Sequence, residues 1–149
     1  MTLRRGGRGD VAAVVALQQA AYAQNRPLLG VEPLPLQVDY AIVLASREVW
    51  LEERGDSLDG VLILEERADH LLIWSIAVAP SVQGTGIGGM LLAHAEARAR
   101  ALGFAKLRLY TGEPLTGNIT WYERHGYVRD RVETLSDRRI VHMVKQLGA

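Results

Sequence analysis

The sequence predicts an α/β fold in which a mixed β-sheet is flanked by helices. An apolar run over 71–78, broken only by Ser75, is typical of a buried strand because it is short and bounded by Pro80. Glycines crowd the loop after it, and apolar residues then recur at helical spacing over 90–102. A strand-like segment follows over 106–111, and a strand, helix, strand unit is a right-handed crossover between parallel strands. The 149 residues, of which 48% are hydrophobic, suit one domain over 1–149.

The first part of the chain predicts a short edge strand over 2–5 and a helix over 11–25 that Asp10 caps at its N-terminus. Three prolines make 26–37 a loop, and a second helix is expected over 36–45.

The remaining elements are separated by glycine or by polar turn residues, which is the pattern of β-hairpins and of a short helix. They are the hairpin strands over 48–53 and 60–65, a helix over 118–124, and the terminal strands over 127–132 and 140–147.

Gly84, Gly86, Gly88 and Gly89 lie between the predicted strand and the predicted helix. Backbone N–H groups at a helix start, together with the positive end of the helix dipole, form an anion site. Glycines let a phosphate approach the backbone because they carry no Cβ. The expected ligand is therefore a phosphate or a pyrophosphate.

Two other phosphate-binding loops share part of this pattern. A P-loop requires Lys and then Ser or Thr after its last glycine, whereas Met90 follows here. A dinucleotide-binding loop requires G-x-G-x-x-G, which Gly84, Gly86 and Gly89 satisfy. Its strand runs directly into the first glycine, however, and residues 80–83 intervene here. The context therefore disfavours a dinucleotide site, and binding of NADH would be the result that favours it.

Two motifs carry a specific family resemblance. Residues 83–88 read Gln-Gly-Thr-Gly-Ile-Gly, and residues 76–80 before them read Ile-Ala-Val-Ala-Pro. Asn118 later precedes Trp-Tyr-Glu-Arg-His-Gly-Tyr over 121–127. In this order and spacing the chain resembles the GNAT family, the Gcn5-related N-acetyltransferases that bind acetyl-CoA, over most of its length.

The resemblance implies a single-domain GNAT fold, with a mixed sheet of about seven strands, about four flanking helices, and a splay between the fourth and fifth strands. The pantetheine of CoA would lie in that splay and hydrogen bond to strand backbone. The implied cofactor-binding residues are Ile76, Ala77, Val78, Gln83, Gly84, Thr85, Gly86, Ile87, Gly88, Gly89, Asn118 and Tyr122.

The implied activity is transfer of an acetyl group from acetyl-CoA to a primary amine, by direct attack in a ternary complex. The backbone N–H of Val78 would stabilise the oxyanion, and Tyr122 would protonate the departing thiolate. A phenol with a pKa of about 10 is protonated at neutral pH and suits a thiol with a pKa of about 8.5. The competing hypothesis is a non-catalytic acyl-CoA-binding sensor or interaction module. Tyr122 argues against that hypothesis.

For the acceptor contacts and the general base, the sequence offers several candidate residues. Some relatives carry a Glu on the strand that corresponds to 71–78, and this sequence has none there, which is compatible with the non-catalytic hypothesis. A water chain that ends on Glu32, Asp39 or His142 could replace that base. The acceptor contacts considered on the basis of the resemblance are Tyr22, Arg26, Glu32, Asp39, Tyr40 and Ser75.

The composition excludes several classes of function. A formal net charge of zero predicts no partnership with nucleic acid or with an anionic membrane surface. The absence of cysteine excludes disulfides, thiolate metal sites and a cysteine nucleophile, and we expect no metal. No segment resembles a signal peptide or a membrane span, so a cytoplasmic protein is expected. A homodimer is plausible by family habit, and no residue decides it.

Overall fold

The computed structural model describes residues 3–148, which form seven strands and five α-helices. In chain order the elements are β1 (Leu3–Arg5), α1 (Val11–Ala23), α2 (Arg26–Leu29), α3 (Tyr40–Ser46), β2 (Glu48–Arg54), β3 (Ser57–Glu66), β4 (Leu71–Val78), α4 (Ile87–Ala101), β5 (Lys106–Gly112), α5 (Thr116–Arg124), β6 (Val128–Thr134) and β7 (Arg139–Gln146), with 3-10 turns at Arg8–Asp10, Leu34–Leu36 and Pro80–Val82. The predicted class of fold, a mixed sheet with flanking helices, is confirmed.

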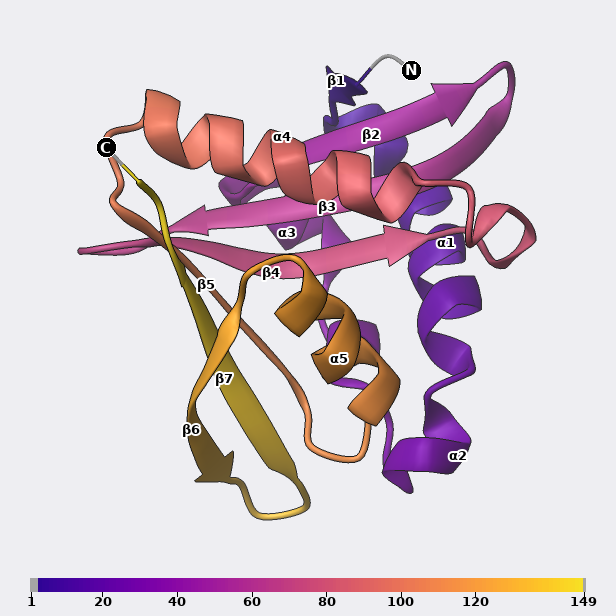
Figure 1. The fold of residues 1–149 in the computed structure, drawn as a ribbon. Coiled ribbons are helices and arrows are strands. Elements are labelled where there is room, and N and C mark those ends of the chain that lie inside the picture. Colours follow the sequence, from indigo (N-terminus) through magenta and orange to yellow (C-terminus); the bar gives the residue numbers. More distant parts are fainter. Residues whose placement is uncertain (1–2, 149) are drawn as a thin grey trace.

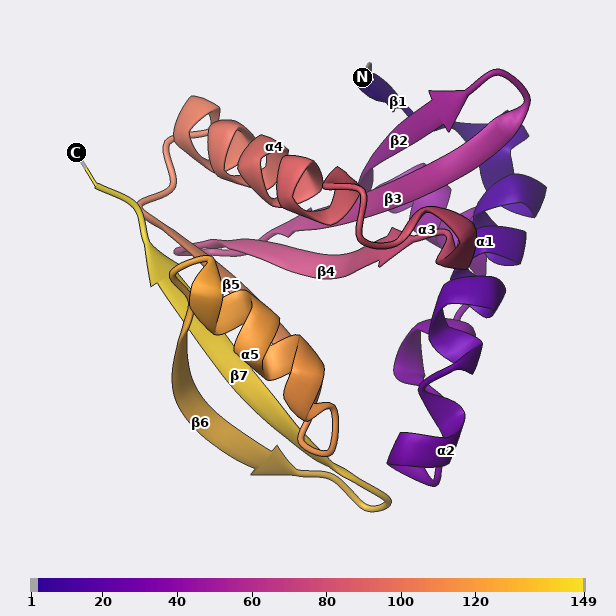
Figure 2. The same cartoon turned by 45° about the vertical axis from the view of Figure 1, so that its right-hand side comes forward.

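The strands form one sheet in the order β1-β2-β3-β4-β5-β7-β6. β4 and β5 run parallel, as the predicted crossover requires, and the other neighbouring pairs of described strands are antiparallel. The β4 and β5 register covers only Leu71 with Leu107 and Leu72 with Arg108, after which the strands diverge (Figures 1 and 2). The expected splay between the fourth and fifth strands is therefore present.

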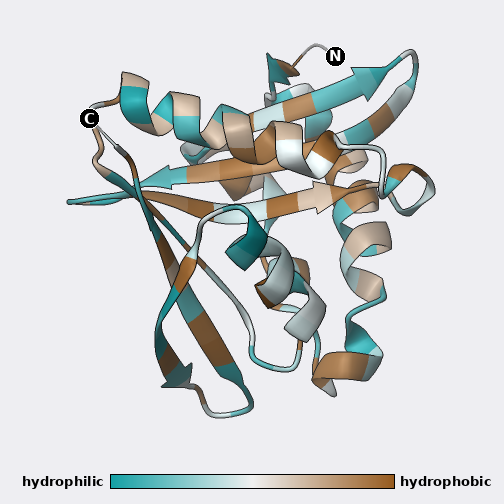
Figure 3. Ribbon diagram, in the orientation of Figure 1, coloured by the Kyte–Doolittle hydropathy of each residue, from teal (hydrophilic) through white to brown (hydrophobic). Residues whose placement is uncertain are grey.

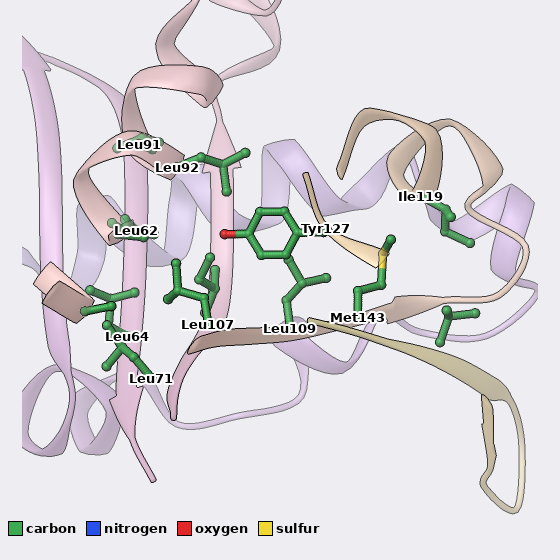
Figure 4. Close-up of a cluster of buried hydrophobic side chains, with 14 of the residues drawn as sticks. Leu62, Leu64, Leu71, Leu91, Leu92, Leu107, Leu109, Ile119, Tyr127 and Met143 are labelled. Atoms are coloured by element: carbon green, nitrogen blue, oxygen red, sulfur yellow. The ribbon is translucent and has the colours of Figure 1, made fainter. Parts of the chain in front are cut away.

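Helices cover both faces of the sheet (Figure 1). α4 and α5 lie on one face, over a core in which Leu91, Leu107 and Ile119 are buried and in which the ring of Tyr127 lies among leucines (Figure 4). α1 and α3 lie on the other face, over a core that contains Val14. Hydrophobic and hydrophilic residues are interspersed along α4 (Figure 3). Because the hydrophobic residues recur at helical spacing, one side of this helix packs on the sheet.

A β-bulge at Trp74 changes the direction of side chains in β4. Ile73 pairs with Leu64 of β3 and Ser75 pairs with Ile63, so Trp74 is the extra residue. Trp74 and Ser75 consequently both face α1, whereas Ile73 lies in the core beneath α4. Strict alternation would place Ser75 on the face opposite to Trp74, so the bulge decides on which side the strand's one polar side chain lies.

Two helices begin at other positions than the sequence predicts. α3 begins at Tyr40, later than predicted, because the proline-rich segment forms a 3-10 turn and the Asp39 side chain caps the helix by accepting the Ala41 N–H at 2.9 Å. α4 begins at Ile87 rather than at Met90, so two of the glycines lie in its first turn.

The N-terminal segment also differs in detail. The Asp10 carboxylate does not cap α1, because it accepts the Gly7 N–H at 2.8 Å and pairs with Arg4 at 2.6 Å. The predicted loop over 26–37 contains the short helix α2, which has a proline in its first turn, where proline is tolerated. None of the helices within residues 3–148 is long and apolar enough to span a bilayer.

Candidate functional site

A cleft of about 420 Å³ opens where β4 and β5 diverge. Its walls come from α1, the end of β4, the glycine-rich loop, the start of α4, and α5. The lining residues are Ala21, Tyr22, Gln24, Asn25, Ile76, Ala77, Val78, Val82, Gln83, Gly84, Gly86, Ile87, Gly88, Gly89, Asn118, Trp121 and Tyr122. The fold thus brings together both motifs on which the family resemblance rests.

The edge of β4 presents main-chain groups to this cleft. The carbonyl of Ile76 accepts a hydrogen bond from the Tyr22 hydroxyl at 3.3 Å, and the carbonyl of Val78 accepts one from Gln83 Nε2 at 3.3 Å. Alternate residues of a strand direct their main-chain groups to the same edge, and β5 has already diverged from this edge. A ligand that carries amides can therefore pair with β4 here in the manner of an added strand.

The glycine-rich loop provides an anion site without formal charge. Gly84 and Gly86 have φ of 81° and 92°, a backbone conformation that favours glycine. The first helical hydrogen bond runs from the Met90 N–H to the Gly86 carbonyl at 3.1 Å, so the N–H groups over 87–89 precede the helical ladder. These groups and the helix dipole favour negative charge at the N-terminus of α4, and the neutral side chain of Gln83 lies beside them.

One predicted cofactor residue lies outside the cleft. The Thr85 hydroxyl donates to the Val82 carbonyl at 2.5 Å, so this side chain holds the loop in place instead of lining the cleft.

One face of α5 closes the cleft. Asn118, Trp121 and Tyr122 share this face because they are spaced by three and four residues. Trp121 lies against the first turn of α4, where a Cβ on Gly88 would come within 3.0 Å of its Cζ2. The His125 ring packs on Trp121 at 4.7 Å between ring centroids, and His125 Nδ1 lies 2.8 Å from the Trp121 carbonyl. A glycine at position 88 therefore allows the aromatic side chain to approach the helix start.

Tyr122 lies at the boundary between this cleft and a second, smaller cavity, since it lines both. Burial, with a smaller effect of Tyr22 and Tyr127, raises the pKa of Tyr122 above the ordinary value for a phenol. Tyr122 is consequently a neutral phenol and a hydrogen-bond donor throughout the physiological pH range.

The second cavity has a volume of about 100 Å³ and lies beneath α2 and the turn before β7. Leu29 of α2 packs on the end of β5, where a Cβ on Gly112 would come within 2.6 Å of Leu29 Cδ2. The lining residues are Tyr22, Asn25, Leu29, Pro33, Leu34, Pro35, Ile73, Trp74, Ser75, Ile76, Leu109, Tyr110, Thr111, Gly112, Leu115, Asn118, Tyr122, Arg138 and Ile140. No carboxylate or imidazole of the described residues lines either cavity, and Arg138 is the one formally charged side chain among them.

A buried polar network connects α1, α3 and β4 beside the second cavity. Ser75 Oγ lies 2.8 Å from the Tyr22 hydroxyl and accepts a hydrogen bond from Gln18 Nε2 at 2.9 Å. Gln18 Nε2 also donates to the Tyr40 hydroxyl at 3.0 Å, and Tyr40 donates to the Pro35 carbonyl at 2.6 Å. Tyr40 is 5% exposed and lines neither cavity, and the acceptor contact expected of it stays a prediction.

The carboxylates and the histidine considered as bases lie elsewhere. Glu32 pairs with Arg26 at 2.5 Å on the surface, Asp39 caps α3, and His142 Nε2 lies 2.8 Å from a carboxylate oxygen of Glu133. None of these five residues lines either cavity, and the acceptor contacts expected at Arg26, Glu32 and Asp39 stay predictions. Within residues 3–148, no cluster of His, Asp and Glu could hold a metal ion.

Sequence reasoning did not identify several residues of the two cavities, notably Asn25, Tyr110, Trp121 and Arg138. The position of Trp121, one helical turn after Asn118, was a signal that could have identified it. Arg138 lies in a polar turn that has no motif, and only the folded chain brings it to the same cavity as residues of α2.

The family model described as "Acetyltransferase (GNAT) family" matches residues 14–127 of the chain. Among curated proteins, an amino-acid acetyltransferase of Ralstonia nicotianae is 42% identical over 64 residues, which are 43% of this chain and only 13% of that protein.

Solved structures extend the similarity to the whole fold. The ribosomal-protein-S18-alanine N-acetyltransferase from Escherichia coli superposes with a TM-score of 0.80 at 19% identity, covering 99% of this chain and 94% of that one. A GNAT family acetyltransferase from Elizabethkingia anophelis with acetyl-CoA bound has a TM-score of 0.75 at 20% identity, covering 98% of this chain and 97% of that one.

Proposed function

The chain belongs to the acetyltransferase (GNAT) family, and from this premise we propose that it transfers an acetyl group from acetyl-CoA to a primary amine by direct attack in a ternary complex. The observation that carries the proposal is the position of Tyr122, where the cleft meets the smaller second cavity. The acyl donor would occupy the cleft, and the acceptor amine would occupy the cavity.

The cleft suits the donor along its whole length. Pantetheine amides would pair with the main chain of Ile76 and Val78, replacing the hydrogen bonds that these carbonyls accept from Tyr22 and Gln83. The pyrophosphate would then lie at the N-terminus of α4, against the free N–H groups over 87–89. The Elizabethkingia anophelis relative, which shares the fold, holds acetyl-CoA.

The proposed reaction forms a C–N bond and breaks the C–S bond of the thioester. The amine nitrogen attacks the thioester carbonyl carbon, and the backbone N–H of Val78 stabilises the oxyanion of the tetrahedral intermediate. The C–S bond then breaks, and the Tyr122 hydroxyl donates its proton to the departing CoA thiolate while water returns a proton to the tyrosine. The extra proton on nitrogen leaves to water, and the products are the acetylated amine and CoA.

The residues that line the cavity suggest how the acceptor's ammonium group loses its proton. Because no described carboxylate or imidazole lines either cavity, we propose that the acceptor reacts from its neutral form, after its ammonium proton has passed to solvent. Apolar surroundings favour this form, since burial disfavours a charged ammonium.

A non-catalytic acyl-CoA-binding module is the second candidate, and the same lack of a base favours it. Calorimetric titration with acetyl-CoA, CoA and NADH, followed by a transfer assay over a panel of amines, separates the possibilities. The proposed enzyme binds both CoA species and not NADH, and acetylates at least one amine. Binding of acetyl-CoA without transfer to any amine would favour the module, and binding of NADH alone would overturn both.

A further inference from the structure

Arg138 is the formally charged side chain in the wall of the second cavity, which is otherwise apolar or neutral. It lies in the turn just before β7, and residues of the proline-rich segment after α2 line the same cavity. Its side chain is only 6% exposed, so the guanidinium is largely withdrawn from water. A buried cation in a small cavity favours a ligand that brings a negative charge.

The present partner of Arg138 does not use all of its donors. Asp137 accepts from Nε at 3.0 Å and from Nη2 at 2.9 Å. Nη1 donates no hydrogen bond to any of residues 3–148. It therefore keeps some contact with solvent, since every fully buried atom that lacks a partner is another one. The guanidinium thus has a free edge while its other edge is held in place.

Asp137 is a weak competitor for a ligand at that edge. Its side chain is 51% exposed, and an ion pair with so exposed a carboxylate contributes little because water screens it. A ligand carboxylate inside the cavity would be desolvated, and the planar guanidinium presents donors that match a carboxylate in a bidentate geometry.

The cavity also reaches the reacting centre. Tyr122 and Arg138 both line it, and Leu29, Leu109 and Ile140 are among its apolar residues. An acceptor that occupies this cavity can present its amine near Tyr122 and an anionic group near Arg138.

We propose that the acceptor is a small amine that also carries a carboxylate, an amino acid in the broad sense, and that Arg138 binds this carboxylate and so determines specificity. The inference rests on the proposed acetyltransferase function, and it adds the chemical class of the acceptor and the residue that recognises it.

The test compares matched acceptors that differ only in the carboxylate: α-, β- and γ-amino acids against their amides, assayed with acetyl-CoA. We expect the wild-type protein to prefer the acids, by about 10- to 100-fold in kcat/KM after correction for the fraction of deprotonated amine, since a hydrogen-bonded charge contributes on this scale. Arg138→Gln should reduce the acid-to-amide ratio by the same factor, and Arg138→Lys should restore part of it.

Arg139→Gln is the matched control. Arg139 is adjacent and loses the same charge, but it is 53% exposed, pairs with Glu113 at 3.0 Å and lines neither cavity of the site. This variant should keep the wild-type ratio. Comparing ratios cancels any difference in amine pKa between acid and amide, because both variants are assayed with the same acceptors.

The outcomes are separable. Equal use of acids and amides by the wild-type protein, transfer to no amino acid at all, or an unchanged ratio in Arg138→Gln would each overturn the inference, and the first two need no variant to fold. Failure of the protein to bind acetyl-CoA in calorimetry would instead overturn the proposed function itself.

Discussion

The cleft and the cavity on the two sides of Tyr122 are built in different ways. The cleft offers backbone groups to a ligand, namely the β4 edge at Ile76 and Val78 and the N–H groups over 87–89. The cavity consists of side chains that come from α1, the segment after α2, β4, β5, α5 and the turn before β7. A backbone site depends on a local motif, whereas a side-chain site depends on how distant segments meet.

This contrast between backbone groups and side chains matches the chemistry of the two proposed ligands. The pyrophosphate and amides of CoA would be recognised by groups that every residue carries, so the cleft needs glycines and a splayed strand more than particular side chains. An acceptor would be recognised by the individual side chains around it, so the identity of residues such as Arg138 would decide which amine is used.

The largest effect should come from Tyr122→Phe, which tests the boundary between the two regions. Loss of the proton donor should lower kcat by about 10²- to 10⁴-fold while the calorimetric affinity for acetyl-CoA is retained. Tyr127→Phe is the control, because its buried hydroxyl has no hydrogen-bond partner within residues 3–148, so removing it should leave kcat near the wild-type value. Full activity of Tyr122→Phe would exclude this residue as the acid.

The pH profile tests whether the acceptor side contains a base. If the neutral amine is the reacting species, kcat/KM should rise about tenfold per pH unit below the pKa of the acceptor amine. Because burial raises the pKa of Tyr122 above the usual value of about 10, its acid form persists and no decline is expected below that pH.

Two acceptors whose amines differ in pKa provide the control for that profile. The inflection should move with the acceptor. An inflection that stays at one pH between about 5 and 7 for both acceptors would reveal an enzyme carboxylate or imidazole and contradict the solvent route.

Gly88→Ala tests the backbone side. The new Cβ would lie within 3.0 Å of Trp121 Cζ2, so the ring or the start of α4 must shift, and the acetyl-CoA Kd should rise about tenfold. Gly117→Ala is the control, since Gly117 lies in α5, lines neither cavity, and a Cβ there would meet no atom within 4 Å.

Trp121→Phe added to Gly88→Ala should recover part of the affinity, because the smaller ring lacks the atoms that the Cβ approaches. Equal Kd values for the two alanine variants would show that this contact does not matter for the cleft.

The smallest effect on turnover should come from Ser75→Ala, which tests the network behind the cavity. It removes the acceptor of the Gln18 Nε2 hydrogen bond at 2.9 Å in a buried site, so the free energy of unfolding should fall by about 1 to 3 kcal/mol in urea denaturation. Ser46→Ala, whose hydroxyl is exposed and donates to the Ile42 carbonyl, should change stability far less. Equal losses in both variants would remove the argument for a stabilising network.

The sequence by itself determined the elements whose signals are local. The β4 strand has the predicted bounds, and the glycine loop and the short helix around Asn118 follow from residue spacing. The parallel pairing of β4 and β5 was predictable as well, because a helix between two strands returns the chain to the end at which the first strand began. The proposed donor site was open to prediction for this reason, since β4, the glycine loop and the start of α4 follow one another in the sequence.

Only the tertiary structure decided the acceptor side. The bulge at Trp74 turned Ser75 towards α1, and packing buried the Tyr40 hydroxyl in a network instead of leaving it to a ligand. Arg138 lines the same cavity as Leu29 of α2, though the two residues lie far apart in the chain. Such contacts arise from side-chain packing between distant segments, and no periodicity or motif in one stretch of sequence records them.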